Sequence, residues 1–74
     1  MIIDIHKMAE DQFRVAYICK NGQLAASLII VDKTTSEISA LITGDQATAA
    51  GSIAKIRKQT ARGNYPDKLS VETG

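Results

Sequence analysis

The first half of the chain alternates apolar and polar residues with the period of two that is typical of β-strands. The clearest part covers residues 13–31, where two apolar segments are separated by Asn21-Gly22. Both of these residues tolerate the positive φ that a two-residue hairpin turn requires. With Asn21 and Gly22 in the turn, Lys20 pairs with Gln23, and all later pairings follow from that register.

This register predicts one continuous apolar face on the hairpin, because directly opposed residues share a sheet face. That face collects Phe13, Val15, Tyr17, Cys19, Leu24, Ala26, Leu28 and Ile30. The opposite face has polar residues at both ends and a weaker apolar centre. The apolar members of this second face are Ala16, Ile18, Ala25, Ile29 and Val31.

Two further strands are expected to flank the hairpin. Residues 2–8 and 36–43 both alternate apolar and polar side chains, and turn-forming residues separate them from the hairpin. A three-residue connection at 33–35 would place Ile30 opposite Ile38. A helix over 36–43 is the alternative, since its apolar residues also suit one face of a helix.

The segment 46–62 has the periodicity of an amphipathic helix with a thin apolar stripe around Ile53 and Ile56. Asp45 is a suitable N-cap, and Gly63 is expected to end the helix. Such a short stripe predicts that the helix depends on docking to the sheet. The far side of the helix carries a basic ridge, formed by Lys55, Lys58 and Arg62.

These elements predict an α+β fold, in which an antiparallel sheet of about four meander strands is followed by one C-terminal helix packed on one face. Residues 1–63 form this single domain, and residues 64–74 are expected to form a polar C-terminal tail, in part disordered. The helix is expected on the side of Phe13, with packing on the other side as the alternative. In either case one apolar face lacks cover, which is typical of an interface.

Composition narrows the class of protein. The 74 residues are 45% hydrophobic and 23% charged with a formal net charge of +1, which excludes a disordered chain and a strongly basic nucleic-acid module. A single core of this size yields little stability, so oligomerisation is expected. One cysteine excludes an intrachain disulfide and indicates the cytoplasm. No apolar run is long enough to span a membrane.

Candidate catalytic chemistry is sparse, so no enzyme activity, metal or cofactor is predicted. Cys19 is expected to be a buried thiol, and His6 has no second histidine with which to bind a metal. The carboxylates are scattered, and no glycine-rich phosphate-binding motif is present. A small enzyme is therefore only a remote alternative.

The sequence predicts a small non-enzymatic protein-interaction or regulatory module. Its interface would be the second apolar face, around Ala16 and Ile18, and its partner a second copy of the chain or another protein. The alternative is a nucleic-acid-binding protein that uses the basic ridge, with Tyr65 stacking on a base.

Overall fold

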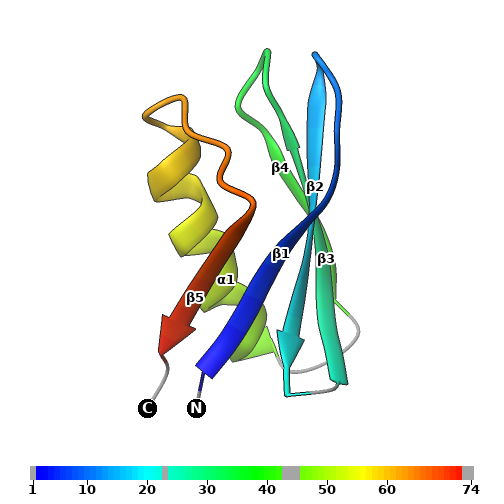
Figure 1. The fold of residues 1–74 in the computed structure, drawn as a ribbon, viewed down its shortest axis with the longest axis vertical. Coiled ribbons are helices and arrows are strands. Elements are labelled where there is room, and N and C mark those ends of the chain that lie inside the picture. Colours follow the sequence, from blue (N-terminus) through cyan, green and yellow to red (C-terminus); the bar gives the residue numbers. More distant parts are fainter. Residues whose placement is uncertain (1, 23, 43–45, 73–74) are drawn as a thin grey trace.

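A computed structural model describes residues 2–22, 24–42 and 46–72, which form a five-stranded antiparallel sheet with one helix packed on it. The helix contacts every strand from one side of the sheet, and no described helix or strand covers the other side, here called the open face (Figure 1). The predicted α+β class, meander order and single helix are confirmed. The elements are β1 (Ile2–Glu10), β2 (Arg14–Asn21), β3 (Leu24–Asp32), β4 (Ile38–Ile42), α1 (Gln46–Thr60) and β5 (Lys68–Glu72).

The fifth strand is a correction to the predicted sheet. Residues 68–72, which the sequence predicts as part of a tail, form β5 and pair antiparallel with β1, with Leu69 opposite Ile5 and Val71 opposite Ile3. Leu69 and Val71 pack partly buried against the core. The sheet order is therefore β4-β3-β2-β1-β5, and α1 connects one edge strand to the other.

The end of α1 follows the predicted signal. Gly63 has a φ of 79°, and its N–H donates to the Thr60 carbonyl at 3.0 Å, while the Asn64 N–H donates to the Gln59 carbonyl at 3.1 Å. These two bonds form a Schellman motif, in which glycine adopts the left-handed conformation without a steric cost. The predicted stop at Gly63 is confirmed, whereas the predicted N-cap Asp45 lies outside the described residues.

The β2–β3 register differs from the prediction in two steps. Asn21 pairs with Leu24, so the turn lies one residue later than expected, and Gly22 supplies a positive φ of 66°. This first step shifts every β2–β3 pairing by two residues, so each side chain of β3 would keep its predicted face of the sheet. A bulge then shifts the pairing by one more residue, because Lys20 pairs with Ala25 but Cys19 pairs with Ser27. An odd shift exchanges the two faces of β3.

Charge placement favours the observed register. The predicted pairing would set Asp32 opposite Asp11, and two like charges directly opposed are destabilising. In the structure Asp32 pairs with Arg14 instead. The Asp11 and Asp32 carboxylates are then free to accept backbone hydrogen bonds in their own turns, at 2.7 Å from the Phe13 N–H and 2.8 Å from the Thr34 N–H.

Residues 38–42 form a strand, so the helical alternative for this segment is wrong. The predicted pairing of Ile30 with Ile38 is also wrong, because Ile38 pairs with Val31. A longer connection accounts for the difference, since the Asp32 N–H donates to the Glu37 carbonyl and Ser36 adopts a φ of 66°. Because β3 has exchanged its faces as well, Ile38 still lies on the helix side, as predicted.

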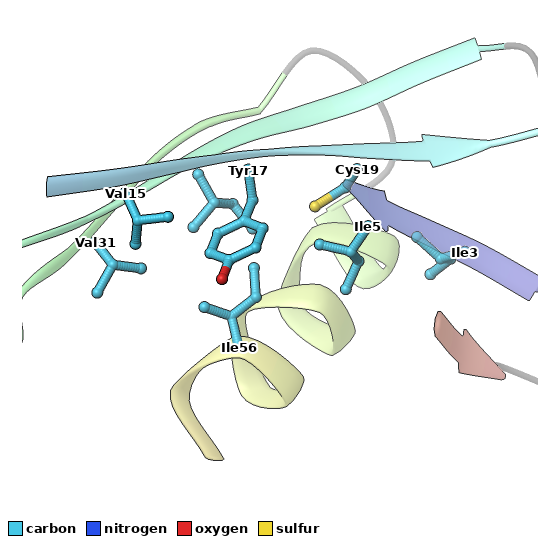
Figure 2. Packing of buried hydrophobic residues seen from close by; sticks show 8 residues of the cluster. Ile3, Ile5, Val15, Tyr17, Cys19, Val31 and Ile56 are labelled. Atoms are coloured by element: carbon cyan, nitrogen blue, oxygen red, sulfur yellow. The ribbon is translucent and has the colours of Figure 1, made fainter. Parts of the chain in front are cut away.

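The core lies between α1 and the sheet (Figure 2). Tyr17 is its largest fully buried side chain, and Ile56 enters from α1. Three predicted core residues are not part of it: Phe13 is 58% exposed in the first turn, and Leu28 and Ile30 lie on the open face. The side chains of Leu24 and Ala26 lie outside the described part. The buried cluster consists of Ile3, Ile5, Val15, Tyr17, Cys19, Ile29, Val31 and Ile56.

The Tyr17 hydroxyl donates to the Pro66 carbonyl at 3.0 Å and so ties the segment before β5 to the central strand. We expect Tyr17→Phe to lower the free energy of unfolding by about 1 kcal/mol, because the Pro66 carbonyl loses its donor. Chemical denaturation measures the change. Tyr65→Phe is the matched control, since no described residue bonds the Tyr65 hydroxyl; an equal loss in both variants would contradict this role.

The Ser27 hydroxyl is buried, and no described residue bonds it. We expect Ser27→Ala to raise the free energy of unfolding by about 1 kcal/mol, because a buried hydroxyl without a partner carries a desolvation cost. Ser70→Ala, at an exposed site in β5, should leave stability nearly unchanged. A marked loss in Ser27→Ala, measured by the same denaturation, would show that the hydroxyl is needed.

Candidate protein-binding face

The centre of the open face is a row of side chains that crosses all five strands. Lys68 lies opposite His6, His6 opposite Ile18, Ile18 opposite Leu28, and Leu28 opposite Leu41. Directly paired residues project to the same side of a sheet, so these five side chains are neighbours. The row is cationic at the β5 edge and apolar from β2 to β4.

A second row runs beside the first on the open face. Ala16 lies opposite Ile30, and Ile30 lies opposite Ser39. Ile18, Leu28 and Ala16 are half-buried by their neighbours, whereas Ile30 is 38% exposed and Leu41 is 63% exposed. The two rows together form an apolar patch over β2, β3 and β4, defined by Ala16, Ile18, Leu28, Ile30 and Leu41.

This apolar patch differs in part from the predicted interface. Ala16 and Ile18 lie on the open face as expected, but Ile29 and Val31 are fully buried against α1, at 0% and 1% exposure. The prediction for these two residues is wrong because the bulge in β3 exchanges the two faces of this strand. The side chain of Ala25 lies outside the described part of the chain.

Sequence reasoning missed Leu28 and Ile30 as members of the apolar patch. The turn residues alone cannot reveal a bulge, because a bulge depends on pairing farther along the strands. The one available signal was electrostatic: aligning Arg14 with Asp32 gives the observed register directly.

Two hollows indent the open face near the β1–β2 turn, and both are lined by Arg14 and Ile30. The larger, of about 310 Å³, also contacts Asp32, Glu37 and Ser39. The smaller, of about 200 Å³, is lined further by Ala9, Glu10, Asp11 and Ala16. The apolar patch therefore has a recessed polar rim at one end.

Two aspartates stabilise the turns at that end. The Asp11 carboxylate accepts from the Arg14 and Phe13 N–H groups, and the Asp32 carboxylate accepts from the Thr34 and Thr35 N–H groups. These hydrogen bonds favour the ionised form, so the pKa of each carboxyl lies below its usual range.

A polar cluster lies on the helix side of the same end. The Lys7 ammonium is 2.7 Å from the Glu10 carboxylate and 3.0 Å from that of Asp67, and the Lys33 ammonium is 2.6 Å from the second Glu10 oxygen. Hydrogen bonds from Lys33 and Lys7 lower the pKa of Glu10, and those to Glu10 and Asp67 raise the pKa of Lys7. The cluster joins the β1 end, the β3–β4 loop and the segment before β5.

The basic ridge lies away from the open face, on α1 and the turn that follows it. Lys58 and Arg62 are exposed and Lys55 is half-buried. Tyr65, the proposed stacking residue, packs partly buried against the core, and the Lys33 ammonium lies 4.7 Å from its ring centroid. One side of the ring is thus already in contact with a cation, and the arrangement does not present Tyr65 together with the ridge as a base-stacking platform.

The two side chains with the most reactive chemistry lie on opposite faces of the sheet. Cys19 is buried on the helix side, as predicted, and His6 is on the open face. They cannot form a dyad across the sheet. Within residues 2–22, 24–42 and 46–72, no three His, Cys, Asp or Glu side chains are grouped as metal ligands. The one described helix, α1, is neither long nor apolar enough to cross a membrane.

No protein-family model matches the sequence, and neither the curated proteins nor the solved structures give a match. The functional argument therefore depends on the geometry of the open face.

The lowered pKa values of Glu10, Asp11 and Asp32 make stability depend on pH. Their stabilising effect is complete above the ordinary carboxyl pKa of about 4 and is lost as the pH falls through the lower folded-state values. We expect thermal unfolding to show a falling melting temperature in acid. Glu10→Gln should lower the melting temperature at neutral pH and weaken its acid dependence.

Glu37→Gln is the control for Glu10→Gln, because no described residue bonds the Glu37 carboxylate. An identical pH profile for Glu10→Gln and the unmodified chain would contradict the role of the polar cluster. Added salt should reduce the difference between them, since the ion pairs are partly exposed.

Proposed function

We propose that this chain is a non-enzymatic protein-interaction or regulatory module that forms a homodimer through the open face of its sheet. The observation that carries the proposal is the apolar patch, which no described element covers (Figure 1). Contiguous apolar surface rimmed by polar residues is typical of protein interfaces.

The three long strands give the open face a size that approaches that of a standard interface. Five strands at ~4.8 Å spacing extend ~19 Å across, and strands of eight or nine residues extend ~27–30 Å. A standard interface takes about 800 Å² from each partner. That area is about one sixth of the 4782 Å² accessible surface of the chain.

A second copy is the partner that the charges and the size of the chain favour. With a net charge of +1, two copies repel each other weakly. Two sheets can pack face to face at ~10 Å, with side chains from both faces interdigitating. In a two-fold symmetric dimer, each copy would bury its own Ile18, Leu28 and Leu41. This burial would add apolar contacts to a domain near the lower size limit for an independent fold.

The remaining parts of the proposal are a non-enzymatic role and a cytoplasmic location. Separation of Cys19 from His6 supports the first, and the buried, unpaired thiol of Cys19 supports the second.

Nucleic-acid binding by the basic ridge is the less favoured alternative. Lys58 and Arg62 are exposed and could contact phosphates, but Tyr65 is engaged by Lys33 and the core. Binding of this kind would weaken steeply with salt and would respond to Lys58→Glu.

Sedimentation velocity over a concentration series tests the dimer. We expect the unmodified chain to sediment at twice its 8.0 kDa mass, and Ile18→Lys to weaken association ~30-fold or more, because an ammonium would be buried at the centre of the interface without a partner. Leu28→Lys should act in the same way.

Ala54→Lys provides the matched control, since it adds the same charge at an exposed position of α1, on the other side of the sheet. Circular dichroism verifies that each variant is folded. A strictly monomeric unmodified chain at its highest soluble concentration would refute the dimer, as would equal association of Ile18→Lys and the unmodified chain.

A further inference from the structure

The only histidine of the chain lies on the proposed interface. His6 is half-buried on the open face, directly opposite Ile18 of the central strand β2 on one side and Lys68 of β5 on the other. It therefore borders the apolar patch at the point where the row changes from apolar to cationic.

The charged residue directly opposite His6 is a cation. Lys68 is its direct neighbour on β5, and Lys20 is the diagonal neighbour on β2. Asp4, two residues before His6 on β1, lies directly opposite Lys20, and Glu72 of β5, opposite Ile2, lies farther along the same face. The helix α1 packs on the other side of the sheet and adds no charge here. A proton on His6 would thus lie directly beside the Lys68 ammonium.

We propose that His6 makes association of the open faces pH-dependent, so that the dimer forms with the neutral imidazole and dissociates when the ring is protonated. This inference rests on the proposed dimer. Pairing of two open faces would remove both His6 rings from water. A charged imidazole in that position would lose its hydration and would lie opposite the Lys68 ammonium, whereas the neutral ring tolerates an apolar neighbour such as Ile18.

The size of the effect follows from proton linkage. Histidine is the side chain that changes charge between pH ~5 and pH ~8, so toward the lower end of this range each ring must release a proton to enter the interface. A symmetric dimer contains two such rings. The dissociation constant should therefore rise ~10-fold or more between pH ~8 and pH ~5.5. The carboxylates that stabilise the turns have lowered pKa values and stay ionised over this range.

The test is the dimer dissociation constant, measured by sedimentation at pH ~8 and pH ~5.5, near the ends of the range over which histidine side chains change charge, with circular dichroism to monitor folding. The unmodified chain should dissociate at the lower pH while it remains folded. His6→Gln keeps a polar side chain that stays neutral at both pH values, so its dissociation constant should be the same at both. His6→Asn replaces it if the glutamine variant folds poorly.

The outcomes separate this inference from the proposed function. A dimer of equal affinity at both pH values, or a full pH effect that persists in His6→Gln, would overturn the role of His6 and leave the dimer intact. A chain that is monomeric at both pH values would overturn the dimer itself, and the role of His6 with it.

Discussion

The pairing of β2 with β3 is the constraint on which the rest of the structure depends. One extra residue in β3, between the partners of Cys19 and Lys20, sets Ile29 and Val31 against α1 and leaves Leu28 and Ile30 on the other side. Both faces of β3 carry apolar side chains, so hydrophobic burial alone barely discriminates between the predicted register and the observed one. Electrostatics does discriminate, because only the observed register places Asp32 opposite Arg14.

A single helix on a five-stranded sheet creates the second constraint. The face under α1 forms a closed core, in which Tyr17 and Ile56 are fully buried. The opposite face keeps apolar side chains on three adjacent strands with no described element over them. The buried core and the apolar patch thus follow from the same register of β3.

Most of the charged groups at one end of the sheet maintain local structure. Asp11 and Asp32 accept backbone hydrogen bonds in two turns, and Glu10 bridges Lys7 and Lys33 between segments that are distant in sequence. These interactions give three of the eight carboxylates of the chain a structural role. Lys7 also reaches the segment before β5: its ammonium lies 3.0 Å from the Asp67 carboxylate, and its backbone N–H donates to the Asp67 carbonyl at 2.8 Å, directly before β5 pairs with β1.

The sequence by itself determined the elements that depend on neighbouring residues: the alternating strands, the meander order, the amphipathic helix and its end at Gly63. Periodicity and turn chemistry act over a few residues, so they can be read locally. For the same reason, the alternation along β2 predicts that Ile18 lies on the side of the sheet away from α1. Only the tertiary structure decided the bulge in β3, the pairing of β5 with β1 and the burial of Ile29. The pairing of β5 with β1 joins segments far apart in the chain, and the bulge depends on pairing farther along the hairpin, where more than one register satisfies the local pattern of apolar residues. The burial of Ile29 follows from that bulge.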